Sequence, residues 1–425
     1  MSIAQAGLSP VRDVLANGVR VIAKQARVTP AVTIHVAVHG GTVADPPGLP
    51  GVAYFLSRMI DRGTTSLTAD QIAESLESRG VSLAVNVTKH SLSLVSTCLV
   101  EDFADVLGIV ADCLMHPVFP EAEIVTRHGE LITFIRQDDD NPAVVAMNGL
   151  MELLYGNAHP YGWPTRGTVA SAEQIGRAEL IDFHTRHVTP ASTVIAIVGD
   201  VEPAAAAGAC ADAFRAWPSG QPTPVALPEP APSSSRSERV LPMMSKAQAD
   251  ITYGFTSIRR FDAEYYAYWL MNNIFGQYSL GGRLGDNIRE RQGMAYYIMS
   301  ALDATVIAGP LVVRAGVAAS NVERAIAAID DEVRRLAAEG PTEKELRESK
   351  QYLIGSLPRT LETNLGIAGF LQTAEFFGLG LDYDQRLPSL LQAVTRDDVH
   401  AAARRTLDPS RAAVVVAGPY DRTPA

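Results

Sequence analysis

A chain of 425 residues is long enough for two or three domains with complete hydrophobic cores. Its content of 47% apolar and 20% charged residues is typical of a globular protein, and its net charge of -11 argues against a nucleic-acid partner, which normally requires a basic surface. No stretch approaches the roughly 18 apolar residues of a membrane span, and the first ten residues lack the pattern of a signal peptide. We therefore expect no membrane span and a cytoplasmic location, with Cys98, Cys113 and Cys210 as reduced thiols.

Strand and helix patterns alternate through the first half of the chain. Alternating or continuous apolar residues, many of them β-branched, predict strands at 19–24, 32–38, 81–87, 91–99 and 193–198. Apolar residues at three- and four-residue spacing predict helices, one of them capped by Thr68. These helices are expected at 51–61, 68–78, 101–115, 121–136, 142–154 and 179–187.

An internal repeat relates the two halves of the chain at an offset of 219 residues. Residues 175–199 align with 394–418 without a gap, through matched arginine, proline and glycine positions and an apolar strand. Amphipathic helices at 103–114 and 322–333 keep the same offset. Such a pattern indicates two copies of one domain.

A segment rich in Pro and Ser, residues 218–236, separates the two copies and shows almost no apolar periodicity. This composition predicts a semi-extended linker. We therefore predict an α+β protein with two homologous domains in tandem, 1–217 and 237–425. Each domain is expected to be a mostly antiparallel sheet packed with helices.

The helix predicted at 51–61 has a polar face of unusual composition. Its apolar residues form one buried stripe, whereas Tyr54, Ser57 and Arg58 share a neighbouring face at positions i, i+3 and i+4. This is the spacing at which His-x-x-Glu-His places two imidazoles on a zinc ion beside a carboxylate. Here the positions hold a phenol, a hydroxyl and a guanidinium, so the frame of a metal site is present without its ligands.

Six segments resemble, in order and over nearly the whole length, the pitrilysin and mitochondrial processing peptidase family of zinc peptidases, the inverzincins. They are Asn17-Gly-Val-Arg-Val-Ile22, the stretch 48–63, Arg136-Gln-Asp-Asp-Asp-Asn-Pro142, His159-Pro-Tyr-Gly162, the stretch 189–200, and 283–297 in the second half. The ordered set, together with the duplication, gives the resemblance its specificity.

The resemblance implies that this chain holds no zinc. The family binds zinc through two histidines and a distant glutamate, and a glutamate within the motif activates the water. The histidine positions correspond to Tyr54 and Arg58, the base to Ser57 and the distant ligand to Phe134. An arginine stays protonated and cannot ligate a dication. Glu130, one turn before Phe134, would supply a single ligand at most.

The resemblance also implies a different role. In heterodimeric members, the chain without zinc carries an arginine and, seven residues later, a tyrosine that bind the substrate backbone near the scissile bond. Arg289 and Tyr296 have this spacing. Both can donate hydrogen bonds to a peptide carbonyl or to the tetrahedral oxyanion. Arg291 and Tyr297 are the alternatives for the two roles, and a solvated arginine with a packing tyrosine is the ordinary interpretation of such residues.

The predicted function is that of the non-zinc subunit of a heterodimeric zinc metallopeptidase. A zinc-bearing partner of the same fold would supply metal and base, while Arg289 and Tyr296 hold the backbone of a peptide substrate. The strand at 81–87, if it forms a sheet edge, offers strand addition for an extended peptide. The alternative is a catalytically inactive relative that acts as a structural scaffold or peptide-binding subunit. The sequence does not decide between a heterodimer and a homodimer.

Overall fold

The computed structural model describes residues 7–278 and 281–421, which form two compact units. The first unit comprises the chain up to Ile135 together with Pro164–Ala226 and Leu357–Gln385. The second comprises Arg136–Trp163, Leu227–Ser356 and the chain from Arg386 on. The units interleave along the sequence, in contrast to the consecutive domains 1–217 and 237–425 that the repeat predicts.

A six-stranded sheet forms the centre of the first unit. Its strands are antiparallel to their neighbours except for β2 and β6, which run parallel. In spatial order they are β1 (Val11–Val14), β2 (Arg20–Gln25), β6 (Thr193–Gly199), β3 (Ala31–His39), β5 (Ser91–Leu99) and β4 (Leu83–Val87). The central strand β6 is buried along its whole length, as its continuous apolar run requires.

Helices cover both faces of this sheet. On one face, Val32, Ile34 and Val36 of β3 enter a large core with the apolar stripe of α1. On the other face, α12 packs its residues Ile367 and Leu371 against β6. The helices of the first unit are α1 (Val52–Met59), α2 (Ala69–Glu77), α3 (Phe103–Met115), α6 (Val169–Ala172), α7 (Arg177–His187), α8 (Pro203–Ala213) and α12 (Asn364–Phe376).

The second unit contains a five-stranded sheet of similar design. Its strands are antiparallel except for the pair β11 and β7. Their spatial order is β7 (Ser237–Pro242), β11 (Ala413–Gly418), β8 (Ala249–Thr256), β10 (Pro310–Val317) and β9 (Ala295–Leu302). The helices of this unit are α5 (Pro142–Tyr155), α9 (Tyr265–Asn272), α10 (Val322–Glu339) and α14 (Arg396–Thr406). Three further helices contain residues of both units: α4 (Glu121–Asp139), α11 (Glu343–Thr360) and α13 (Tyr383–Ala393).

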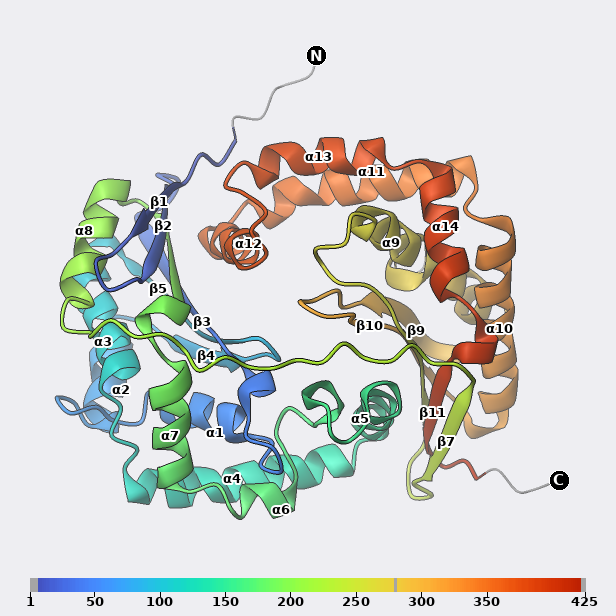
Figure 1. Ribbon diagram of the computed structural model, residues 1–425, viewed down its shortest axis with the longest axis horizontal. Coiled ribbons are helices and arrows are strands. Elements are labelled where there is room, and N and C mark those ends of the chain that lie inside the picture. Colours follow the sequence, from blue (N-terminus) through green and yellow to red (C-terminus); the bar gives the residue numbers. More distant parts are fainter. Residues whose placement is uncertain (1–6, 279–280, 422–425) are drawn as a thin grey trace. The chain divides into compact units, whose positions relative to one another are not determined.

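Each sequence half contributes one helix to the sheet of the other half (Figure 1). Helix α5 lies in the first half of the sequence but packs on β8 and β11, where Thr252 Oγ1 donates to Ala146 O at 2.8 Å. The contact is close, because a Cβ at Gly149 would lie 3.2 Å from Val415 Cγ1. The 219-residue offset carries α5 onto residues 361–374, which overlap α12. The exchange is therefore reciprocal.

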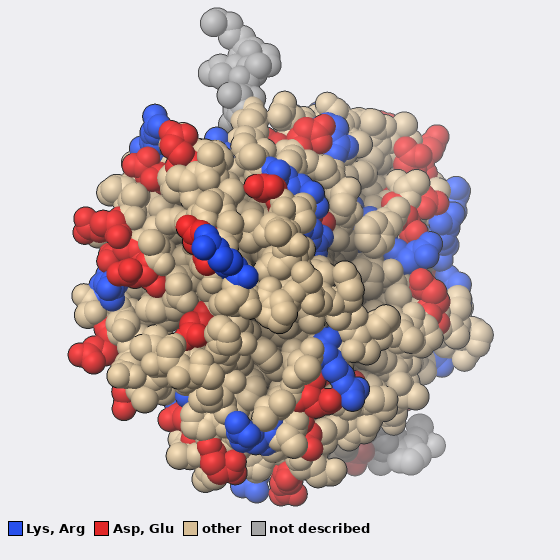
Figure 2. All heavy atoms as spheres, turned by 60° about the vertical axis from the view of Figure 1, so that its left-hand side comes forward, with Lys and Arg blue, Asp and Glu red and all other residues tan. Residues whose placement is uncertain are grey.

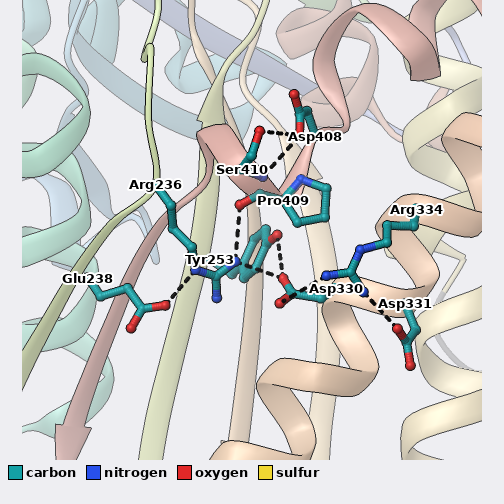
Figure 3. A network of polar contacts seen from close by, with 9 residues as sticks. All are labelled: Arg236, Glu238, Tyr253, Asp330, Asp331, Arg334, Asp408, Pro409 and Ser410. Atoms are coloured by element: carbon teal, nitrogen blue, oxygen red, sulfur yellow. Dashed lines mark hydrogen bonds and ion pairs between the residues drawn. The ribbon is translucent and has the colours of Figure 1, made fainter.

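The segment 218–236 contains no helix or strand. Its last residue, Arg236, is anchored in the second unit (Figure 3). The guanidinium donates to Asp330 Oδ1 at 2.9 Å and to Pro409 O at 3.1 Å, and it lies 5.5 Å from the ring centroid of Tyr253. Tyr253 also donates to Asp330 Oδ1, at 2.8 Å. These contacts fix the point at which the linker enters β7.

The distribution of charged side chains on the surface agrees with the absence of a basic excess in the sequence. On the face drawn in Figure 2, basic and acidic side chains are interspersed and do not gather into one basic patch. Among the residues that the structure describes, no helix is both long and apolar enough to cross a membrane. The predicted α+β class is confirmed, and Thr68 caps α2 as expected, accepting from Gln71 N at 3.2 Å.

Candidate functional site

Helix α1 begins at a buried cap. Gly51 precedes it with a φ of 103°, and the Asp45 carboxylate accepts from the backbone N–H groups of Gly51 and Ala53, both at 2.7 Å. Burial raises the pKa of Asp45 to about 7, although both hydrogen bonds favour the charged form. The apolar stripe of α1, including Phe55 and Met59, is fully buried. This packing fixes the direction in which the polar face points.

The three polar residues of α1 differ in their environment. Ser57 is buried, and its Oγ donates to Tyr54 O of the same helix at 2.6 Å. A hydroxyl held in this way cannot replace a carboxylate as general base. Tyr54 and Arg58 are half-buried. Among the described residues, none accepts a hydrogen bond from the Arg58 guanidinium. Its positive charge acts to lower the pKa values of Asp61 and Glu130.

Arg166, which the sequence patterns do not single out, completes this site. Its Nε donates to the phenolic oxygen of Tyr54 at 3.1 Å. Its guanidinium carbon lies 5.4 Å from the ring centroid of Tyr54 and 5.8 Å from that of Phe134. A guanidinium cation therefore contacts both Tyr54 and Phe134, two of the positions that the resemblance predicts for the family's zinc ligands.

Close backbone packing holds Arg166 in place. A Cβ at Gly51 would lie 2.6 Å from Arg166 O, and a Cβ at Gly167 would lie 2.1 Å from Pro50 O. Gly167, like Gly51, has a positive φ, of 75°. Ser171 Oγ adds a hydrogen bond to Pro50 O at 2.8 Å. Two loops more than one hundred residues apart in sequence are thus locked together, which only the three-dimensional structure reveals.

Helix α4 supplies the remaining residues of this site, Phe134 and Glu130. Phe134 is 37% exposed, so its ring is only partly covered by Arg166. Glu130 accepts two hydrogen bonds from Arg127 Nη1, at 2.7 and 2.9 Å, and this pairing lowers the pKa of Glu130. The described residues contain no group of three or more His, Cys, Asp or Glu side chains arranged to hold a metal ion.

The predicted pair Arg289 and Tyr296 lies in the second unit. Arg289 belongs to a π-helical segment, Gly285–Arg291. Gly293, with a φ of 62°, follows it before β9 begins. The Arg289 side chain is 42% exposed, and its Nε lies 3.8 Å from Glu290 Oε1. Tyr296 is 63% exposed on β9, the last strand in the order of its sheet.

The two alternative residues are held by internal contacts. The hydroxyl of Tyr297 donates to the Asp250 carboxylate, and its ring lies so close to Gly316 that a Cβ there would meet it at 2.4 Å. Burial raises the pKa of Tyr297. Arg291 pairs with Asp286 at 2.6 Å. Tyr296 therefore makes fewer polar contacts than its alternative Tyr297, and Arg289 makes weaker ones than its alternative Arg291.

Comparisons with known proteins agree with this arrangement. Residues 20–166 match the family described as Insulinase (Peptidase family M16), and residues 174–353 match the Peptidase M16 inactive domain. An uncharacterized zinc protease YmxG of Bacillus subtilis is 26% identical, over 82% of this chain and 83% of its own length. A non-peptidase homolog YmxG of Helicobacter pylori is 24% identical, over 90% of this chain and 88% of its own.

Solved structures show the same fold. A peptidase M16 inactive domain from Pseudomonas fluorescens is similar with a TM-score of 0.89 and 27% identity, covering 97% of this chain and 98% of that one. A protease from Helicobacter pylori has a TM-score of 0.89 at 15% identity, covering 96% and 99%. The chain belongs to peptidase family M16, which confirms the pitrilysin-like assignment. It is a homologue of proteins named zinc proteases.

Proposed function

We propose that this protein is the non-zinc subunit of a two-chain M16 metallopeptidase. The observation that carries the proposal is the contrast between two sites. The zinc-motif positions are occupied by Tyr54, Ser57 and Arg58, with the guanidinium of Arg166 against Tyr54. Arg289 and Tyr296 in the other unit keep their polar ends exposed. The first site has lost the chemistry of the family, whereas the second retains its substrate-binding pair.

Each residue has a distinct role in this proposal. Arg289 donates to a main-chain carbonyl of a peptide substrate, and Tyr296 donates to the carbonyl that becomes the oxyanion. A partner subunit of the same fold binds zinc and supplies the base, and this chain itself needs no cofactor. Strand β4, at one end of its sheet order, offers backbone groups for strand addition by the extended peptide.

A cytoplasmic location is part of the proposal. Cys98, Cys113 and Cys210 are free and buried, as suits a reducing compartment. Burial raises the pKa of the Cys98 thiol to about 11 and those of Cys113 and Cys210 to about 12, so the three sulfurs stay protonated and unreactive at neutral pH.

The test is reconstitution with a zinc-bearing M16 chain from the same source. The purified proteins are mixed, assembly is followed by size-exclusion chromatography, and cleavage of quenched fluorescent peptides is measured for each chain and for the mixture. Tyr296→Phe and Arg289→Ala are each expected to lower kcat of the complex at least tenfold, because each removes one hydrogen-bond donor from the transition state.

A matched variant at a neighbouring position provides the control. Arg291→Ala leaves the activity of the complex unchanged, since its guanidinium pairs with Asp286. All variants should assemble as the parent chain does. Absence of a complex, or a complex that is no more active than the zinc-bearing chain alone, would refute the proposal.

A second candidate is a catalytically inactive scaffold or peptide-binding subunit. The position of Arg166 favours it, because a fixed guanidinium stabilises the emptied site without any need for catalysis. Fluorescence anisotropy with labelled unfolded peptides separates the candidates. Peptide binding that no zinc-bearing partner converts into cleavage, and that Tyr296→Phe does not alter, identifies the scaffold or peptide-binding role.

A further inference from the structure

The Pro-rich segment covers a cavity in the second unit. This cavity, here called the linker cavity, has a volume of about 250 Å³. Its walls include Pro230 of the segment, Phe255 and Ser257 at the end of β8, Tyr268 of α9, and the pair Arg405 and Arg411. Pockets for drug-sized ligands typically have volumes of about 300–1,000 Å³, so the linker cavity suits a smaller molecule or a single amino-acid residue.

The lining of the linker cavity is cationic, although the chain carries a net charge of -11. Two arginines and five hydroxyl-bearing residues line it, without any Asp or Glu. Arg405 Nη1 donates to Glu264 at 3.0 Å, and Arg411 Nε lies 3.4 Å from Asp408 Oδ2, but neither acid is part of the wall. A guanidinium carries five N–H donors, so each arginine retains donors for a ligand.

Asp408 is directed toward another partner. Its Oδ1 accepts from Ser410 N at 2.9 Å and from Ser410 Oγ at 2.7 Å, which Figure 3 shows. These hydrogen bonds lower the pKa of Asp408, which therefore stays ionised. Arg411 in turn donates through Nη2 to Arg405 O at 2.6 Å. The guanidinium of Arg411 is thus fixed on the backbone of α14 beside the cavity.

Two polar atoms at the cavity lack a hydrogen bond. Ser257 Oγ and Arg411 Nε are buried, and neither makes a hydrogen bond within the described residues, although Arg411 Nε forms an ion pair with Asp408 Oδ2 at 3.4 Å. A buried donor without an acceptor is destabilising, so an oxygen ligand that reaches both atoms would be stabilised by them. The hydroxyl of Tyr268, by contrast, accepts from Thr406 Oγ1 at 3.2 Å, and this residue is buried. The buried hydroxyl of Ser257 therefore needs an acceptor most, and Arg411 Nε, which has an ion pair but no hydrogen bond, lies at the same cavity.

Part of the wall is apolar. The ring of Phe255, the side chain of Ala308 and the pyrrolidine ring of Pro230 face the same volume. A ligand that fills it needs an anionic end for the arginines and an apolar body for the remaining wall. We infer that the linker cavity binds a small organic carboxylate with an apolar side group, either a free N-acyl amino acid or the C-terminal residue of a peptide. This inference is independent of the proposed subunit role.

The test is calorimetric titration of the full-length chain at constant ionic strength. The first probe is N-acetyl-L-leucine, and its matched neutral control is N-acetyl-L-leucine amide. We expect saturable binding of the acid with a Kd in the millimolar range or below, and at least tenfold weaker binding of the amide. An acetylated tripeptide that ends in a free leucine carboxylate, compared with its amide, distinguishes a peptide end from a free amino acid as the source.

Variants locate the binding site. The side chain of Arg405 is 65% exposed in the parent protein. The variant Arg405→Gln is therefore expected to fold normally. It should weaken binding of the acid at least fivefold, and Arg411→Gln at least tenfold. Arg404, the adjacent residue of α14, does not line the cavity. Arg404→Gln should therefore leave binding unchanged. Circular dichroism of each variant checks its fold.

Each contrary result counts against the inference. Equal binding of acid and amide would show that the arginines do not recognise the ligand. Binding of inorganic phosphate without binding of either carboxylate probe would assign the cavity to another anion and overturn the inference. Unchanged affinity in a correctly folded Arg405→Gln variant would place the carboxylate elsewhere. Binding of the tripeptide acid alone supports the inference and assigns its source to peptide ends.

Discussion

At the scale of single residues, Arg166 is the most informative side chain. It places a permanent positive charge against Tyr54 and Phe134, two of the positions that the sequence resemblance predicts to match the family's zinc ligands. The backbone beside it is closely packed, because a Cβ at Gly51 would lie 2.6 Å from Arg166 O. If these positions match the family's ligands as predicted, we expect that the family's ligands alone would not restore a metal site beside this cation.

Restoring those ligands tests this interpretation. The variant with Tyr54→His, Ser57→Glu, Arg58→His and Phe134→Glu should bind zinc weakly, because the Arg166 guanidinium repels the dication. Adding Arg166→Leu should raise the zinc affinity at least tenfold, which corresponds to about 1.4 kcal/mol. Competition with a chromogenic chelator measures both affinities. Arg62→Leu on the same background is the control, and equal affinities with and without Arg166 would contradict the interpretation.

At the scale of secondary-structure elements, local patterns predicted most of the strands and helices in the first half of the chain. The strand at 91–99 appears with the expected bounds because its alternation is strict and one face is buried. The contact of Arg166 with α1 was not predicted, since it joins loops distant in sequence and leaves no periodic signal. The exchange of α5 and α12 was also not predicted. An apolar helix face has the same pattern whichever sheet it covers.

Helix α12 covers a part of its sheet that is rich in histidine. The carbonyl of His35 accepts from Gln372 Nε2 at 2.6 Å, and Phe376 packs edge-on against the His39 ring at a centroid distance of 4.7 Å. His90 also lies near Phe376, at 6.1 Å. Burial lowers the pKa of His35, His39 and His90 to about 4. The packed element therefore requires these rings to be neutral.

Acidification should release this element. An unfolded histidine has a pKa of about 6.5, so the unfolded chain binds more protons than the folded chain between pH 6.5 and 4. The free energy of unfolding is therefore undiminished above pH 6.5 and falls as the pH decreases toward 4. His39→Phe should reduce this slope by up to about 1.4 kcal/mol per pH unit. Urea unfolding at pH 7, 5.5 and 4.5 measures it, and identical slopes in both proteins would refute the assignment.

At the scale of the whole molecule, the helix exchange means that neither sequence half contains a complete core. Residues 1–226 include all six strands of the first sheet but not α12. Ile22, Val194 and Ala196, which are fully buried beneath α12, would be exposed to water. Burial of apolar area contributes about 25 cal/mol per Å², so this loss removes a large part of a stability that is normally only about 5–15 kcal/mol.

The fragments 1–226 and 227–425 provide the decisive measurement. Two independent tandem domains would each fold alone, whereas an exchanged pair requires both fragments. We expect each fragment alone to lack cooperative urea unfolding and to bind a hydrophobic dye, and the mixture to regain a single cooperative transition.

A fusion of residues 357–385 to fragment 1–226 through a flexible linker isolates the contribution of α12. This fusion should unfold cooperatively without the other half, because it restores the apolar cover of the sheet. Leu371→Asp in the fusion, which buries a carboxylate against β6, should abolish that gain. Cooperative unfolding of the bare fragment 1–226 would instead show that α12 is dispensable, and the two halves would then be independent domains in the sense that the sequence repeat suggests.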